Sequence, residues 1–189
     1  MRSLHICAFC LVFYRSVTRF QVEFKTLQAV SFSSDLGSRF QEAGYSLPKP
    51  LIPVHGIPMI EVVINNLCPK RPHRFTFICQ REHVERCQLG KLLGKAAPGC
   101  KLIVIDRVTE GAACTVLLAR DIIDCQQPLM IANCDQWIDA SIDDYLTAGG
   151  RGSWDGFLMT MSATNAPTRP CRNDGPTRCA IFWRCDALL

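Results

Sequence analysis

The chain carries the stretch LGSRF at residues 36–40, and PKPL follows it at residues 48–51. The glycine at position 37 lets the backbone approach oxygen atoms closely, and the N–H groups of such a turn form an anion-binding concavity. Arg39 can grip a phosphate through two parallel hydrogen bonds, and Lys49 adds a compact positive charge ten residues later. Prolines on both sides of Lys49 stiffen the backbone there. This stretch therefore predicts a loop that binds a polyphosphate.

The sequence around this loop predicts an α/β fold. Apolar strands are expected at residues 27–32, 74–79, 101–105, 129–132 and 157–161, and helices at 58–67, 81–95, 112–123 and 139–147. Strands that alternate with helices imply right-handed crossovers and a mostly parallel sheet. We therefore expect a three-layer, Rossmann-like α/β fold with helices on both faces and a sheet that is incomplete at its C-terminal end.

Charge separates the two ends of the chain from its centre. Residues 36–165 hold 13 Lys/Arg and 13 Asp/Glu, whereas residues 1–35 and 166–189 each hold four basic and two acidic side chains. The net charge of +4 therefore comes from the ends, which argues against a nucleic-acid-binding face and excludes nucleic acid as the expected partner. We predict an α/β domain at residues 27–165, between an atypical N-terminal extension at 1–26 and an atypical C-terminal tail at 166–189.

Each end contains one apolar run. Residues 4–14 follow an arginine, as in a secretory signal peptide, but the run is short and no small-residue cleavage site follows it. Residues 181–183 could form a short strand or an adherent tail. Neither run reaches the ~18 apolar residues that a membrane span requires, so no membrane span is expected.

The 12 cysteines show no paired zinc-ligand spacing. Scattered reduced thiols in an intracellular protein are the expected interpretation. Three of them lie on predicted elements and are expected to be core thiols, namely Cys114, Cys125 and Cys134.

A second candidate site is the stretch TEGAA at residues 109–113. Glycine at the entry of a helix allows a base or ribose to approach closely, and the free N–H groups there favour anions. The alternative is an ordinary helix start, with Thr109 as the cap and Gly111 as the turn.

A third candidate is Asp135, which follows the apolar strand at 129–132 almost at once. Ligands of open α/β sheets bind at the carboxyl ends of the strands. The carboxylate of Asp135 therefore lies where a bound ligand is expected. The alternative is that Asp135 caps the helix expected at 139–147.

The spacing of GSR at 37–39 and PK at 48–49 resembles the signature of the sugar-phosphate nucleotidyltransferases, or nucleotide-sugar pyrophosphorylases. That signature reads roughly Gly-Gly-x-Gly-Thr/Ser-Arg, with Pro-Lys ten residues after the arginine. The following PLIPVHGIPMI at 50–60 is also similar to the family, and the resemblance covers about residues 36–165. The chain thus looks like a member of the family that is truncated.

The resemblance implies that a sugar 1-phosphate attacks the α-phosphorus of a nucleoside triphosphate and that pyrophosphate leaves. Arg39 and Lys49 would be catalytic, and Asp135 would hold Mg²⁺ as the cofactor. The substrate-binding residues would be Gly37, Ser38, Glu110, Gly111 and Ala112. Such a protein would serve nucleotide-sugar biosynthesis in the cytoplasm, as a monomer or a homo-oligomer.

Two alternatives stay open. Ser34-Asp35 stands where the family has Gly-Gly or Ala-Gly, and a carboxylate there would repel a triphosphate, as in a non-catalytic or truncated relative that binds nucleotide weakly or not at all. The second alternative is a glycosyltransferase of similar fold that uses a nucleotide-sugar donor and an Asp-x-Asp metal motif. This chain has Asn133-Cys134-Asp135 at that place.

Overall fold

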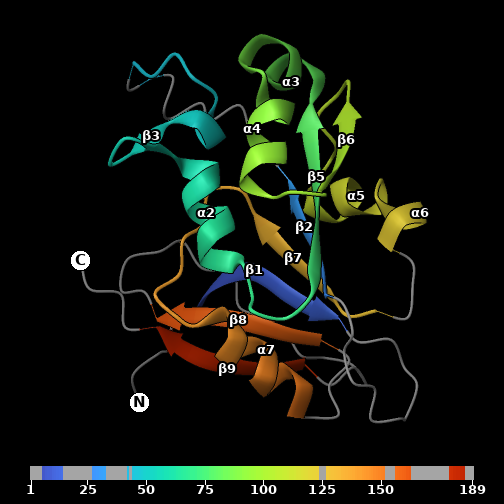
Figure 1. Cartoon of the computed structure of the whole chain (residues 1–189). Coiled ribbons are helices and arrows are strands. Elements are labelled where there is room, and N and C mark those ends of the chain that lie inside the picture. The colour runs from blue at the N-terminus through green and yellow to red at the C-terminus, as the bar shows by residue number, and fades with distance from the viewer. Residues whose placement is uncertain are drawn as a thin grey trace.

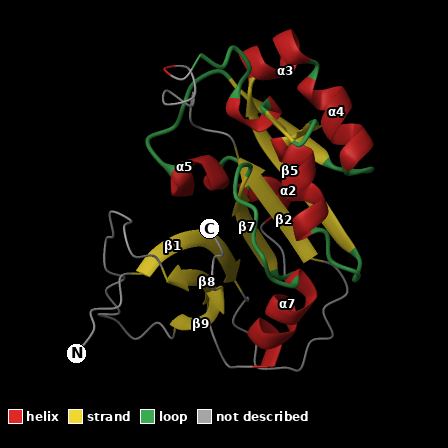
Figure 2. Ribbon diagram, turned by 90° about the vertical axis from the view of Figure 1, so that its left-hand side faces the viewer, coloured by secondary structure: helices red, strands yellow, loops and turns green. Residues whose placement is uncertain are grey.

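A seven-stranded sheet covered by helices on both faces forms the computed structural model of this chain (Figures 1 and 2). The structure describes residues 6–14, 27–32, 42, 44–123, 127–151, 156–162 and 179–185. The strands of the sheet are β1 (Ile6–Tyr14), β2 (Leu27–Phe32), β5 (His73–Gln80), β6 (Lys101–Ile105), β7 (Leu129–Asn133), β8 (Gly156–Ser162) and β9 (Cys179–Cys185). Their order across the sheet is β6-β5-β2-β7-β1-β8-β9.

The sheet is mostly parallel. Strands β6, β5, β2 and β7 run parallel to one another, and β8 runs parallel to β9. Only β1 is antiparallel to its neighbours, β7 and β8. The expected α/β class and the expected parallel sheet are therefore confirmed.

Two strands come from the segments expected to lie outside the domain. The backbone of β1 pairs with β7 on one side and with β8 on the other, so the strand predicted to be first, at 27–32, is the second in the chain. Ile181 pairs with Leu158, so the strand interpretation of residues 181–183 is the one observed. The division at residues 27 and 165 stays a prediction, because strand pairing does not show where an independently folding unit ends.

The helices bury two separate clusters of side chains, one on each face of the sheet. Their bounds are α2 (Met59–Leu67), α3 (Arg81–Cys87), α4 (Leu89–Ala96), α5 (Ala112–Leu117), α6 (Arg120–Ile123) and α7 (Ile142–Arg151). Side chains of α2, α4 and α7 share the larger cluster, whereas Val116 of α5 and the nearby Ala119 lie in the smaller one. This is the three-layer arrangement that the sequence predicts. No helix among the described residues is long and apolar enough to cross a membrane.

Strand β5 serves both clusters because neighbouring side chains of a strand point to opposite faces. Phe75, Phe77 and Cys79 belong to the larger cluster, and the rings of the two phenylalanines stack at 5.7 Å. Ile78 belongs to the smaller cluster. A strand buried on both faces reads as a continuous apolar run, which is why it is visible in the sequence.

Two of the predicted helices are each two helices, so those predictions are wrong in detail. The expected helix at 81–95 is broken at Gln88, whose φ of 51° lies in the left-handed region. The expected helix at 112–123 is broken after Leu117, where Leu118 and Ala119 bond back three residues instead of four. Neither break carries a proline or glycine to announce it.

The long loop before α2 contains local structure. A 3₁₀ turn, η1 (Lys49–Leu51), precedes a two-stranded hairpin of β3 (Pro53–Val54) and β4 (Ile57–Pro58). His55 and Gly56 both have positive φ, the conformation that a type I′ hairpin turn requires. Pro58 was predicted to be the first residue of the helix, but the helix begins at Met59 and Pro58 directly precedes it.

Candidate active site

The carboxyl edge of the sheet brings two of the predicted site residues together. Nζ of Lys49 forms an ion pair with Oδ2 of Asp135, although the two residues lie far apart in the sequence. Parallel strands β2 and β7 are neighbours, and Phe32 pairs with Asn133 at their carboxyl ends. The loops that follow these strands therefore start side by side, and each contributes one member of the pair.

The prolines around Lys49 hold its backbone as the sequence predicts. Pro50 is buried, and the N–H of Leu51 donates to the carbonyl of Pro48 at 2.8 Å. The Lys49 side chain is 24% exposed and that of Asp135 is 19% exposed. Both charges are thus partly shielded from water, which strengthens their interaction.

The segment after Asp135 is fixed by a residue that sequence reasoning missed. The N–H of Ile138 donates to Oδ1 of Asn66 at 2.9 Å, and Nδ2 of Asn66 donates to the carbonyl of Ile138 at 2.8 Å. Both backbone groups of Ile138 are thereby held by one side chain of α2. The sequence gives only a weak indication of this role, because Asn66 is a single amide next to the apolar stripe formed by Val63, Ile64 and Leu67.

The capping interpretation of Asp135 is wrong. The helix expected at 139–147 begins at Ile142, and Oγ of Ser141 accepts from the N–H of Asp144 at 3.2 Å. Ser141 is therefore the capping residue. Asp135 lies well before this helix, in a turn that directly follows β7, and its carboxylate faces Lys49.

The turn at 109–113 also lies at the carboxyl edge, after β6. Glu110, Gly111 and Ala112 are all exposed, and a Cβ added to Gly111 would meet nothing within 4 Å. The interpretation of Thr109 as the cap is wrong: Gly111 is the N-cap, and no side chain caps α5. The hydroxyls of Thr109 and Thr115 each donate to the Gly111 carbonyl at 3.1 Å.

The turn and the ion pair do not coincide. In the sheet order, β6 is separated from β2 by β5, which is a distance of about 10 Å at the usual strand spacing. Helix α5 nevertheless packs against β2, the strand whose following loop carries the polyphosphate signature. The turn at 109–113 and the Lys49–Asp135 pair therefore lie apart along the same edge of the sheet, an arrangement that would suit a ligand long enough to reach both.

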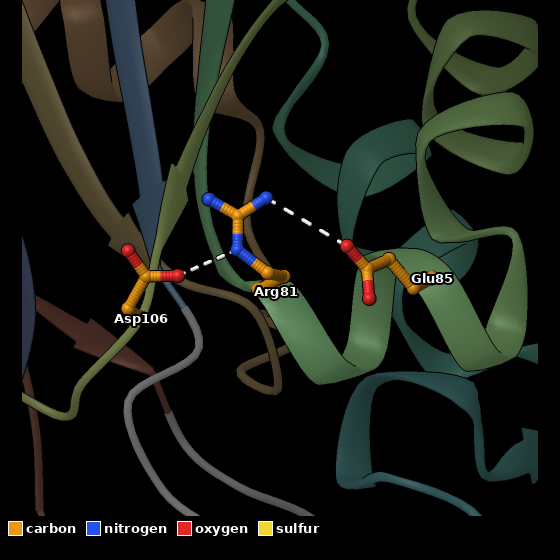
Figure 3. A network of polar contacts seen from close by, with 3 residues as sticks. All are labelled: Arg81, Glu85 and Asp106. Carbon is orange, nitrogen blue, oxygen red and sulfur yellow. Dashed lines mark hydrogen bonds and ion pairs between the residues drawn. The ribbon is translucent and has the colours of Figure 1, made fainter.

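A further charged network lies at the same edge, between the first turns of α3 and the loop that follows β6 (Figure 3). Nε of Arg81 donates to Oδ1 of Asp106 at 2.5 Å, and its Nη1 lies 3.7 Å from Oε1 of Glu85. The hydrogen bond from Arg81 lowers the pKa of Asp106, and the same bond raises the pKa of Arg81. Both side chains are more than half exposed, so the network joins the start of α3 to the end of β6 without adding much stability.

Several predicted residues are not placed by the structure. Gly37, Ser38 and Arg39 lie outside the described residues, as do Asp35 and Cys125. Among the thiols expected in the core, Cys134 is buried, whereas Cys114 is exposed, so that prediction is wrong for Cys114.

A metal ion would find a single carboxylate at the pair. Among the described residues, no group of three or more His, Cys, Asp or Glu side chains could hold a metal ion. Mg²⁺ is usually bound through one or two carboxylates together with substrate phosphates and water. Asp135, which already faces a cationic group, fits that donor set once phosphate oxygens are supplied.

The comparison with protein families decides the assignment. The profile described as nucleotidyl transferase matches residues 35–166, which is more than half of the chain. This chain belongs to the nucleotidyl transferase family. The match nearly coincides with the region of resemblance predicted from the sequence, 36–165, and confirms it. No curated protein matches the chain with significant sequence similarity.

Solved structures of nucleotidyl transferases share the fold. The inositol-1-phosphate CTP transferase from T. maritima is 18% identical with a TM-score of 0.52, and the superposition covers 69% of this chain and 50% of the transferase. A putative glucose-1-phosphate thymidylyltransferase from Bacillus anthracis is 17% identical with a TM-score of 0.57, with 73% and 56% covered. A UTP-bound UGPase from Acinetobacter baumannii is 16% identical with a TM-score of 0.56, with 74% and 57% covered. The chain therefore spans about half the length of these structures.

Proposed function

We propose that this protein transfers a nucleoside monophosphate from a nucleoside triphosphate to a sugar 1-phosphate and releases pyrophosphate. The observation that carries the proposal is the Lys49–Asp135 ion pair at the carboxyl edge of the parallel sheet. Family membership supports nucleotidyl transfer as the reaction. The names of two structural neighbours, which include inositol-1-phosphate and glucose-1-phosphate, support a 1-phosphate as the acceptor.

The reaction needs charge and position rather than a protein nucleophile. An oxygen of the sugar 1-phosphate would attack the α-phosphorus, and the bond from that phosphorus to the pyrophosphate oxygen would break. In this scheme Lys49 neutralises negative charge on the phosphates, and Gly37, Ser38 and Arg39 in the same loop hold the triphosphate. Glu110, Gly111 and Ala112 would border the base or ribose.

The ion pair implies an exchange of partners when substrates bind. The Lys49 ammonium balances the charge of the Asp135 carboxylate, so each of these partly buried charges has a partner before substrate binds. Asp135 would be the residue that holds Mg²⁺, which supplies further neutralisation of the phosphates. Lys49 would then turn to a phosphate oxygen, and each of the two groups would keep an opposite charge beside it.

The test is pyrophosphate release from each nucleoside triphosphate, with and without a panel of sugar 1-phosphates. Lys49→Ala and Asp135→Asn should each lower the rate by about 10²–10³-fold, the usual cost of removing a preorganised charge. Lys101→Ala serves as the matched control, because Lys101 is exposed at the start of β6, away from the carboxyl edge. Equal rates for Lys49→Ala and Lys101→Ala would overturn the proposed role.

Binding separates the enzyme from its alternatives. Calorimetry should detect saturable, Mg²⁺-dependent binding of a nucleoside triphosphate, and Arg39→Ala should abolish it. A folded chain that binds no triphosphate would point to the non-catalytic relative. Release of a nucleoside diphosphate from a nucleotide sugar, without pyrophosphate, would point to the glycosyltransferase.

We also propose that the protein acts in the cytoplasm, where nucleoside triphosphates and Mg²⁺ are supplied together. The six cysteines whose side chains the structure describes are all free thiols, as expected in a reducing compartment. Self-association is a further proposal, because β6 and β9 are the outer strands of the sheet and outer strands can pair with another copy. Fractionation and sedimentation measurements would test the two statements.

A further inference from the structure

A cysteine and a histidine form a hydrogen-bonded pair away from the candidate active site. Cys68 follows the last residue of α2 and is exposed, and its Sγ lies 3.5 Å from Nε2 of His73. His73 is the first residue of β5, so the pair lies at the amino end of that strand. The Lys49–Asp135 pair lies at the carboxyl edge of the sheet, so the two sites are on opposite edges.

The backbone determines which nitrogen of His73 accepts a proton. Nδ1 lies 2.9 Å from the carbonyl oxygen of Arg71. Because a carbonyl oxygen can only accept, Nδ1 must carry the proton of the neutral ring, which leaves Nε2 as an acceptor. The Cys68 thiol therefore donates to Nε2.

The imidazole ring is also held by packing. It meets the ring of Phe75 edge-to-face, with centroids 5.3 Å apart and planes at 84°. A nucleophile beside a base that a third group orients is the arrangement that activates thiols and hydroxyls in proteins. Cys114 is the other exposed thiol that the structure describes, and none of its described contacts is to a histidine.

Charged residues of both signs lie near the pair. Lys70 and Arg71 lie between Cys68 and His73 in the sequence. The carboxylate of Asp143 accepts from the N–H of Lys70 at 3.1 Å.

We propose that Cys68 is a site of reversible modification by small disulfides, with His73 as the proton acceptor. The thiol proton passes to Nε2, and the thiolate attacks one sulfur of the disulfide. The bond between the two sulfurs of that molecule breaks, and Cys68 gains a mixed disulfide. The second sulfur leaves as a thiolate and takes the proton from Nε2. Cys68 is oxidised and the small disulfide is reduced, so electrons and protons balance.

The first test uses iodoacetamide, an uncharged probe that the neighbouring cations neither attract nor repel. Peptide mass spectrometry gives the alkylation rate at Cys68 and at Cys114 in the same sample. A free thiol is only about 3% thiolate at pH 7, so ionisation can raise the rate by at most ~30-fold. We expect Cys68 in the native chain to react about three- to tenfold faster than in the urea-unfolded chain. A native rate no higher than the unfolded rate would overturn the proposal.

The second test removes the base. His73→Gln should lower the Cys68 rate to that of the unfolded chain and leave the Cys114 rate unchanged. In His73→Ala, added imidazole should restore part of the rate, which a purely packing role of the ring would not produce. Finally, glutathione disulfide should form a mixed disulfide at Cys68 before any at Cys114, and dithiothreitol should remove it. Unaltered reactivity in both variants, or a first adduct at Cys114, would refute the assignment.

Discussion

Replacing Asn66 by alanine tests how the segment that carries Asp135 is held. Asn66 makes two hydrogen bonds to the backbone of Ile138, at 2.9 and 2.8 Å, and both are partly buried. Each such bond contributes about 0.5–1.5 kcal/mol net, so their loss should cost about 1–3 kcal/mol. Alanine is the better helix former by up to ~0.7 kcal/mol, which would hide part of this loss.

Asn65→Ala is the matched control, because Asn65 is the exposed neighbour of Asn66 on the same helix. The gain in helix propensity is common to both variants, so the difference between them isolates the two hydrogen bonds. We expect urea denaturation to place Asn66→Ala about 2 kcal/mol below Asn65→Ala, or ~4–8 °C lower in thermal midpoint for a chain of this size. Equal stabilities, within about 0.5 kcal/mol, would refute the reasoning.

Four further predictions concern stability, pH dependence and thiol reactivity. Gly94→Ala should stabilise the protein by about 0.5–1 kcal/mol, because a Cβ at this exposed position in α4 meets nothing within 4 Å. Gly56→Ala should destabilise the protein by about 1–2 kcal/mol, because the φ of Gly56 is +83°. Urea denaturation measures both changes. Burial lowers the pKa of His83, so the unfolded chain binds a proton at this residue more readily than the native chain does. The contribution of neutral His83 to stability is fully present above about pH 6.5, and it should be lost as the pH falls toward the lower native pKa. A thermal midpoint that stays constant from pH 7 to 5 would contradict this. Burial, aided by the charge of Cys100, raises the pKa of Cys79 to about 12, so alkylation of Cys79 at pH 8 should track global unfolding, and rapid alkylation of the native chain would be the contrary result.

The strands β5 and β6 could be predicted from the sequence because both of their faces carry apolar side chains. The observed β6 has the bounds expected from the run at 101–105, and β5 differs from the expected strand by one residue at each end. The strand at residues 6–14 was not expected. Its apolar run resembles a signal peptide as much as a strand, and its partners lie at residues 129–131 and 156–162, a distance over which local pattern gives no information.

The helix breaks show a different limit. Gln88 is a good helix former, yet it adopts a left-handed conformation that starts α4 in a new direction. Leu89 and Leu93 then become buried, and a Cβ on Gly90 would approach Cδ2 of Leu102 at 3.3 Å. Packing against the sheet thus overrides local propensity, and packing cannot be read from a single stretch of sequence.

The candidate site was predictable where a fixed spacing or a strand end marks it. Lys49 was marked by its prolines and its distance from Arg39, and Asp135 by its place after an apolar strand. Their ion pair follows from the neighbouring positions of β2 and β7, which depend on sheet order and not on local sequence. Asn66 could not be predicted for the same reason, because its role is to hydrogen-bond the backbone of Ile138, which lies far along the chain.

The position of β1 has a consequence for how the chain is made. Its backbone partners β7 and β8 both come later in the sequence, so β1 cannot be paired on both sides until residue 162 has left the ribosome. During that interval the growing chain carries an apolar segment that lacks one or both of its partner strands. Contacts between such distant segments form slowly, and unpaired apolar strands invite aggregation. We therefore expect the nascent chain to depend on a holding chaperone until β8 has been synthesised, and ribosome-bound fragments that stop before residue 156 should bind one more strongly than the released protein does.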